Sequence, residues 1–164
     1  MPKIEIRGVT DEEWELWRDL RLGALSEAPY AFGSTLSDWS GDNDREERWR
    51  DRLRTNAVSF VSEADGVPCG MVAVYSKVAG DCELISMWVS PKFRGMGVGD
   101  ALIAAVLEFA NDQGFEQVHL SVKEANARAV DLYLRNDFEF SSSVEPRSGC
   151  ELAMVRSIAG EVSG

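Results

Sequence analysis

The hydrophobic positions along the chain switch between a period of two and a period of three to four, and each switch marks a predicted element. Apolar and polar residues alternate in the predicted strands, whereas apolar residues recur every three or four positions in the predicted helices. In order, the predicted elements are a strand over 3–9, helices over 11–27 and 44–55, strands over 57–63, 69–77 and 82–89, a helix over 98–113, a strand over 117–123, a helix over 126–135, and strands over 138–144 and 149–156.

Turn and cap residues set the predicted boundaries. Thr10 to Glu13 fits a capping box, in which the Thr10 side chain accepts from the backbone and the Glu13 side chain reaches back. Pro29 ends the first helix, and the polar residues 30–43 are predicted to form a loop. Gly114 stands where a left-handed cap would end the helix over 98–113. The order β-α-α-β-β-β-α-β-α-β-β predicts an α/β (α+β) fold with one sheet and flanking helices.

The length of 164 residues suits one domain, which we expect over 1–158, with 159–164 as a flexible tail. The net charge of −11 argues against a nucleic-acid partner, because phosphate affinity needs clustered Lys and Arg. No apolar run approaches the roughly 20 residues that span a bilayer, and the N-terminus lacks an apolar signal core. We therefore expect a cytoplasmic protein with no membrane partner.

The cysteine and histidine residues do not suggest a metal site, a redox pair or a catalytic thiol. The three cysteines, Cys69, Cys82 and Cys150, show no zinc or redox spacing, and each falls in a predicted strand, so reduced, mostly buried thiols are expected. The lone His119 alternates with apolar neighbours and is interpreted as a packing or surface residue. No metal site is predicted.

The strongest chemical signal is the turn Arg94-Gly95-Met96-Gly97-Val98-Gly99, which joins a predicted strand to an amphipathic helix. Glycines let the backbone curl tightly with its N–H groups uncovered. These groups lie at a helix N-terminus, whose dipole carries about half a positive charge, so a pyrophosphate would fit there. Arg94 adds a formal cation.

Other phosphate-binding motifs fit this turn poorly. A P-loop needs Gly-Lys-Ser/Thr, and neither Lys nor Ser/Thr follows Gly99. The dinucleotide fingerprint needs a GxGxxG spacing near the first strand, which this turn does not have. A glycine-rich helix entry that binds no ligand stays open as an alternative.

Two motifs resemble the GNAT acetyltransferases. Arg94-x-x-Gly97-x-Gly99 is similar to the acyl-CoA pyrophosphate signature of that family, and the run from Asn126 to Tyr133, followed by Phe138, is similar to its Asn-x-x-Ala-x-x-Leu-Tyr run. Asp137 stands where the family commonly has Gly, and Asp tolerates the left-handed conformation that such a turn needs. The resemblance covers nearly the whole chain and implies a mixed, mostly antiparallel sheet of about seven strands flanked by four helices.

The resemblance also implies a site for acetyl-CoA as co-substrate. The backbone of Met87, Trp88 and Val89 would pair with the pantetheine, and the turn over 94–99, with Arg94, Gly95, Met96, Gly97, Val98 and Gly99, would hold the pyrophosphate. Asn126, Ala129 and Tyr133 share one helix face, which would meet the cofactor. Asn126 would hydrogen-bond the pantetheine.

Two side chains are candidates for proton transfer. Tyr133 would donate a proton to the departing thiolate, and the alternative is a packed tyrosine. Glu83 is the candidate general base, and the alternative is a strand-end glutamate in solvent or in a salt bridge. Alternation puts Glu83 on the same strand face as Met87 unless a bulge intervenes.

The acceptor is an amine of a small molecule or a protein, and nothing in the sequence chooses among such amines. By resemblance, its pocket would be lined by Arg21, Tyr30, Phe32 and Trp39, although core packing explains most of them equally well. The expected function is an N-acetyltransferase working by direct attack in a ternary complex, with a possible homodimer. The alternatives are a noncatalytic acyl-CoA-binding or sensing module and a phosphate-binding domain of another class, such as a nucleotide binder.

Overall fold

A computed structural model describes residues 2–146 and 151–158. Its strands form one sheet of order β1-β2-β3-β4-β5-β7-β6, in which only the β4–β5 pair is parallel. The strands are β1 (Ile4–Val9), β2 (Val58–Ala64), β3 (Val67–Val78), β4 (Asp81–Val89), β5 (Gln117–Lys123), β6 (Glu139–Phe140) and β7 (Glu151–Ser157). The predicted mixed, mostly antiparallel sheet of seven strands is confirmed.

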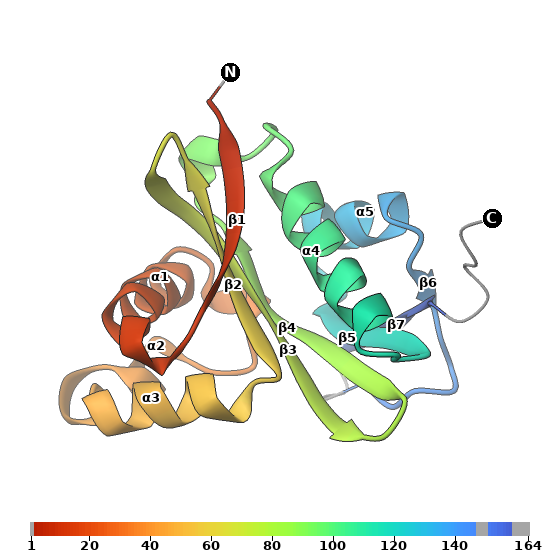
Figure 1. Ribbon diagram of the computed structural model, residues 1–164, viewed down its shortest axis with the longest axis horizontal. Helices are drawn as coiled ribbons and strands as arrows, with labels where there is room; N and C mark the ends of the chain where they lie inside the picture. Colours follow the sequence, from red (N-terminus) through yellow and green to blue (C-terminus); the bar gives the residue numbers. More distant parts are fainter. Residues whose placement is uncertain (1, 147–150, 159–164) are drawn as a thin grey trace.

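Helices cover both faces of the sheet, with α1, α2 and α3 on one face and α4 and α5 on the other (Figure 1). The helices are α1 (Trp14–Glu27), α2 (Leu36–Trp39), α3 (Glu46–Thr55), α4 (Val98–Asp112) and α5 (Ala127–Arg135). Short 3-10 turns lie at Asp11–Glu13, Pro29–Ala31, Gly41–Asn43 and Pro91–Phe93. Within the described ranges, no helix has the length and apolar character needed to cross a membrane.

Each face of the sheet has its own apolar core. Under α4 and α5, the core joins residues such as Leu102, Val106 and Phe138 to the inner faces of the strands. Under α1 and α3, Trp17 and Trp49 are fully buried against β2 and β3. Burial of side chains of this size contributes on the order of 2 to 3 kcal/mol each, which fixes both helical layers on the sheet.

Three local predictions were wrong, and each has a physical reason. Thr10 caps a 3-10 turn by accepting from Glu12, while the Glu13 carboxylate turns away to pair with Arg7, so no capping box forms there. The capping box is instead made by Thr35 and Asp38, which start the short α2 inside the predicted loop.

The third wrong prediction is the strand over 138–144, since the strand that forms beside β7 comprises only Glu139 and Phe140. Both residues are exposed, so little burial supports a longer strand. The start of the last predicted strand, with Cys150, and the predicted tail over 159–164 lie outside the described residues. The left-handed cap at Gly114 is confirmed, with φ of 78°.

Candidate active site

Strands β4 and β5 form a fork. Their parallel pairing consists of Asp81 with Gln117, Cys82 with Val118, and Glu83 with His119, after which the two strands separate. β4 runs on to Val89 and pairs there with β3, while β5 pairs on its other side with β7. Within the described residues, the backbone of β4 from Leu84 onward therefore has a free edge toward β5, and Met87, Trp88 and Val89 lie on this stretch.

A β-bulge at Ser86 reorients β4 inside this fork. Met71 pairs with Trp88 but Ala73 pairs with Ile85, so β4 has one extra residue, and Ser86 has a positive φ of 58°. The bulge reverses the alternation. Ile85 packs with the core under α1, whereas Met87 packs with the core under α4.

The sequence analysis placed Glu83 and Met87 on the same face of the strand unless a bulge intervenes, and the bulge at Ser86 does intervene. Glu83 and Met87 do not share a face of β4, because the extra residue between them exchanges the two faces. Met87 and Val89 turn toward α4 and α5, and Trp88 turns toward α1.

The glycine turn after β4 leads into α4 as the sequence predicted. Gly97 is the N-cap of α4, with φ of 83°, and it has no side chain that could cap the first N–H groups of the helix. Gly99 lies against α5, because a Cβ built on it would come 3.0 Å from Leu132 Cδ2. The turn thus presents uncapped amides beside a tightly packed α4–α5 junction.

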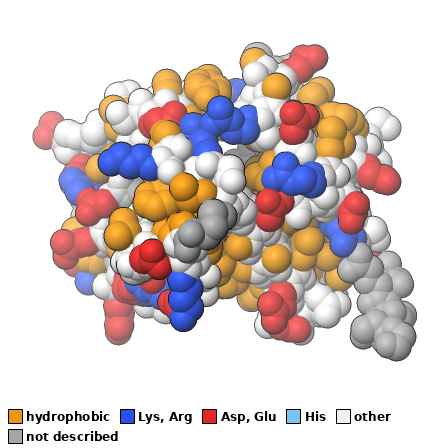
Figure 2. Space-filling model, turned by 90° about the horizontal axis from the view of Figure 1, so that it is seen from above, with side chains coloured by type: hydrophobic (Ala, Val, Ile, Leu, Met, Phe, Trp, Pro, Cys, Tyr) orange, Lys and Arg blue, Asp and Glu red, His pale blue; other side chains and the backbone are white. Residues whose placement is uncertain are grey.

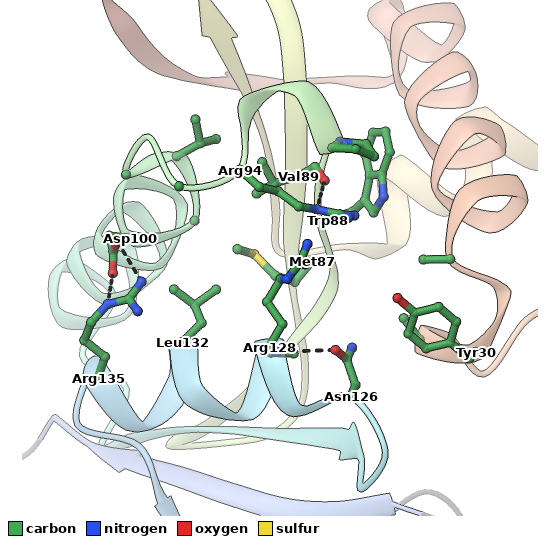
Figure 3. A pocket seen from close by; sticks show the side chains of 18 residues that line it. Tyr30, Met87, Trp88, Val89, Arg94, Asp100, Asn126, Arg128, Leu132 and Arg135 are labelled. Atoms are coloured by element: carbon green, nitrogen blue, oxygen red, sulfur yellow. Dashed lines mark hydrogen bonds and ion pairs between the residues drawn. The ribbon is translucent and has the colours of Figure 1, made fainter. Parts of the chain in front are cut away.

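A cavity of about 950 Å³ opens between the fork, the turn and α5 (Figure 3). Pockets of this size accommodate large organic ligands. It is lined by Ala28, Tyr30, Ala31, Met87, Trp88, Val89, Pro91, Arg94, Gly95, Gly97, Val98, Gly99, Asp100, Asn126, Arg128, Ala129, Leu132 and Arg135. Ten residues predicted to hold the cofactor are in this set, whereas Met96 packs against the core beneath α4 and Tyr133 is buried.

Arg94 is held at the mouth of the cavity from two directions. Its Nε donates to the Val89 carbonyl at 3.0 Å, and its Nη2 pairs with the carboxylate of Glu27 at the end of α1. The indole Nε1 of Trp88 donates to the same carboxylate oxygen at 3.1 Å. Glu27 was missed by the sequence analysis, because a glutamate in the last turn of a helix carries no motif.

Two further arginines line the cavity. Arg135 donates to the Asp100 carboxylate at 3.0 Å, and this ion pair lowers the pKa of Asp100 below its usual range. Arg128 reaches from α5 toward Met87 (Figure 3) and makes no hydrogen bond or ion pair within the described residues. The sequence analysis missed Arg128, although it lies inside the Asn126–Tyr133 run.

Basic side chains also gather near the middle of the face toward which the N-terminus of α4 points, with acidic ones among them (Figure 2). Although the chain has a net charge of −11, three arginines line the cavity, two of them paired with carboxylates and Arg128 unpaired within the described residues. Anionic ligands are attracted to such a site despite the net charge, because nearby charges dominate the potential there.

Asn126 and Ala129 lie side by side on the cavity wall. Asn126 is the N-cap of α5, and its Oδ1 accepts from the Ala129 backbone at 3.3 Å. Its Nδ2 makes no hydrogen bond within the described residues, so that group is available to a ligand acceptor.

Tyr133 lies on the inner side of α5. Its side chain is 6% exposed and packs edge-on against Phe138, with ring centroids 5.7 Å apart. Burial raises the pKa of Tyr133 well above its usual range, so the phenol keeps its proton at neutral pH. Its role as an acid stays a prediction, as does the alternative of a packed tyrosine.

Glu83 stands at the last paired position of the fork, opposite His119, and it is outside the cavity lining. The imidazole Nδ1 of His119 lies 2.9 Å from the Asp81 carboxylate, so the histidine is held at the closed end of the fork rather than on a plain packing face. The role of Glu83 as a base stays a prediction.

Of the residues predicted for the acceptor pocket, only Tyr30 lines the cavity, and it is exposed. Phe32 and Trp39 pack against the core under α1. Arg21 is buried beside Phe32, with its guanidinium carbon 4.7 Å from the ring centroid.

The cysteines of the described residues are packing groups. Cys69 and Cys82 are buried in β3 and β4, as predicted. Burial raises the pKa of Cys69 above its usual range and that of Cys82 to about 12, so neither forms a thiolate at neutral pH. In the part of the chain that the structure describes, no cluster of three or more His, Cys, Asp and Glu side chains could hold a metal ion.

Comparison with known proteins agrees with this geometry. Residues 13–138 match the acetyltransferase (GNAT) family, a range that includes the fork, the glycine turn and α5. The chain therefore belongs to the GNAT family of acetyltransferases.

Two curated relatives show the range of acceptors in related proteins. The thialysine N-epsilon-acetyltransferase of Bos taurus is 44% identical over 85 residues, which are 46% of this chain and 50% of that protein. The mycothiol acetyltransferase of Thermobispora bispora is 33% identical over 125 residues, 73% of this chain and 40% of that one. The chain spans half or less of the length of these relatives.

Solved structures share the fold. The PaiA N-acetyltransferase of Thermoplasma acidophilum in complex with coenzyme A has a TM-score of 0.76 and 17% identity, covering 94% of this chain and 99% of that one. YncA of Salmonella typhimurium with its cofactor acetyl-CoA has a TM-score of 0.75 and 17% identity, covering 99% and 98%.

Proposed function

We propose that this protein is an N-acetyltransferase that moves the acetyl group of acetyl-CoA to an amine by direct attack in a ternary complex. The observation that carries the proposal is the single cavity wall shared by the free edge of β4, the glycine turn and α5. An extended pantetheine needs backbone groups along its length, and a pyrophosphate needs N–H groups and cations at one end. The fork supplies the first and the turn with Arg94 the second.

Acetyl-CoA would lie with its pyrophosphate over the amides that follow Gly97 and its pantetheine along Met87 to Val89. The Asn126 Nδ2 faces the same cavity and would donate to a pantetheine carbonyl. Backbone N–H groups on the free edge would stabilise the oxygen of the thioester as it gains negative charge in the transition state.

The reaction would proceed by attack of a neutral amine on the thioester carbonyl, with loss of the amine proton and departure of the thiolate. The fully protonated Tyr133 suits the role of donor to the thiolate, and Glu83 at the closed end of the fork suits the role of base, directly or through water. The acceptor would be an amine of a small molecule or of a protein, as the name of the Bos taurus relative illustrates for that protein's own substrate.

The test is thiol release from acetyl-CoA in the presence of a panel of amines, with the acetylated product identified by mass. Amine-dependent thiol release supports the proposal. Acetyl-CoA binding without transfer to any amine would favour a noncatalytic acyl-CoA-binding module instead.

A further inference from the structure

Arg21 is a buried cation without a counterion. Its side chain, on the sheet-facing side of α1, is 6% exposed, and its Nη1 is fully enclosed with no hydrogen-bond partner. Across residues 2–146 and 151–158, its guanidinium makes no ion pair, and the guanidinium carbon lies 4.7 Å from the centroid of the Phe32 ring. Packing of the aliphatic stem explains burial of the methylenes but not of the charged end.

Three other arginines of the same helical layer are neutralised by carboxylates: Arg18 of α1 pairs with Asp44, and on α3 Arg50 pairs with Glu46 and Arg54 with Asp11. The chain has 28 acidic residues against 17 basic ones, so carboxylates are plentiful. Arg45 and Arg48 of this layer also make no ion pair within the described residues, but neither is buried, so Arg21 is distinct in being both buried and unpaired.

The surroundings increase the local positive charge. Burial and the nearby charge of Arg52 on α3 lower the pKa of Arg21 to about 10, so the group is destabilised as a cation but remains charged at neutral pH. A buried, unpaired charge is costly, and the cost falls when an anion binds beside it.

Arg21 does not line the cavity itself, but the chain that follows it on α1 leads to the cavity wall. Arg21, Ala24 and Ala28 follow one another along one face of α1, and Ala28 lines the cavity about 10 Å further along the helix axis. Phe32, which covers the guanidinium, directly follows Ala31 of the cavity wall. Trp88 of the cavity wall lies against α1, with its ring 3.7 Å from where a Cβ on Gly23 would stand.

We propose that Arg21 binds a carboxylate of the acceptor, so that the enzyme acetylates amines that also carry a carboxylate, such as amino acids and their derivatives. This inference rests on the proposed acetyltransferase function. An arginine is suited to the task, because its planar guanidinium can bind a carboxylate through two hydrogen bonds while stacked on an aromatic ring.

The experiment compares amines that differ only in the carboxylate: lysine with cadaverine, ornithine with putrescine, and phenylalanine with phenethylamine. In the wild type, the kcat/KM of a carboxylated amine should exceed that of its partner by about tenfold or more, through KM. Arg21→Met should abolish the preference, and Arg21→Lys should restore part of it. Arg54→Met, which removes a paired surface arginine of α3, is the matched control and should leave the preference unchanged.

Arg21→Met should fold, because it removes a charge that has no partner; a melting temperature close to the wild type verifies this. If transfer of acetyl groups to the amines without a carboxylate is equal or faster, or if the preference survives in Arg21→Met, the carboxylate inference is overturned while the transferase proposal stands.

A second measurement needs no turnover. The CoA-saturated protein is titrated with N-acetylated amino acids and with the corresponding amides. Tighter binding of the acids, lost in Arg21→Met, supports the inference; equal binding of acid and amide overturns it. Failure of the transferase proposal is seen separately, as absence of CoA binding or of thiol release with every amine.

Discussion

Glu27 and Arg94 form an ion pair that joins the end of α1 to the turn before α4, across the mouth of the cavity. The pair is partly buried, with side-chain exposures of 29% and 25%. Arg94 is the cation expected to meet the pyrophosphate, so a carboxylate already occupies the position of a ligand anion. If acetyl-CoA binds at this turn as proposed, it has to displace Glu27 from Arg94 or bring three negative groups together.

Removing the Glu27 charge should therefore strengthen acetyl-CoA binding. Glu27→Gln keeps the side-chain shape and the contact with Trp88 but no longer competes for Arg94, and we expect a dissociation constant lower by about 3- to 10-fold, a modest effect because the pair is partly exposed. Calorimetric titration measures it, with Glu46→Gln on the outer surface of α3 as control. Weaker binding by Glu27→Gln would mean that Glu27 positions Arg94 rather than competing with the ligand.

Arg128 should contribute to binding through its charge. It faces the cavity without a partner in the described residues, so Arg128→Ala should raise the dissociation constant of acetyl-CoA by about tenfold and flatten its dependence on salt concentration. Arg135→Ala provides a comparison, because Arg135 is already paired with Asp100. Equal affinity and equal salt dependence in Arg128→Ala would show that the ligand does not reach it.

The close contact with Leu132 should prevent position 99 from accepting a side chain larger than that of glycine without a loss of stability. A Cβ at position 99 would lie 3.0 Å from Leu132 Cδ2 and 3.5 Å from Met87 Cε, so Gly99→Val overpacks the α4–α5 junction. We expect a loss of about 2 kcal/mol and a melting temperature lower by about 4 to 8 °C. Adding Leu132→Ala should recover part of the loss in a double-mutant cycle, whereas simple additivity of the two changes would contradict the contact.

Tyr133→Phe separates catalysis from packing. The ring packs against Phe138 and the hydroxyl makes no hydrogen bond within the described residues, so the variant should keep its melting temperature. If the phenol donates to the thiolate, kcat should fall by about a hundredfold while the affinity for acetyl-CoA stays within about twofold.

The pH dependence of the reaction rate at high pH should also reflect the Tyr133 phenol. Burial raises the pKa of Tyr133, so the acid form that donates the proton persists beyond the usual tyrosine range. The wild-type rate should therefore show no decline from Tyr133 ionisation up to about pH 10. An unchanged kcat in Tyr133→Phe would leave Tyr133 as a packing residue.

The fold was largely predictable, because the apolar periods at β2 to β5 and at α4 are strong and long. The weaker elements were not: Glu13 was expected to cap its own helix, but Arg7 of the preceding strand takes its carboxylate. α2 depends on a capping box of Thr35 and Asp38 over only four residues, too short for a periodic signal.

The candidate site was predictable where a sequence motif also fixes the position of the backbone. The glycine turn and Asn126 lie on the cavity because their positions follow from a strand end, a helix start and a helix cap. Glu27 and Arg128 could be assigned to the site only from the structure, since Glu27 pairs with Arg94 from a helix distant in sequence and Arg128 lies on the cavity wall opposite β4. The bulge at Ser86, which turns Glu83 and Met87 to opposite faces, comes from strand pairing that no local pattern specifies.

The most direct test of the account is a calorimetric titration of acetyl-CoA into the purified protein, with ATP as the competing phosphate ligand. Gly97→Glu places a carboxylate at the N-cap of α4, and Gly97→Ala carries the same backbone strain at φ of 83° without the charge. We predict a dissociation constant on the order of micromolar for acetyl-CoA, lost in Gly97→Glu and retained within about tenfold in Gly97→Ala, with ATP much weaker. Absence of acetyl-CoA binding to the wild-type protein, or equal binding by Gly97→Glu, would contradict the assignment of this cavity as the acetyl-CoA site.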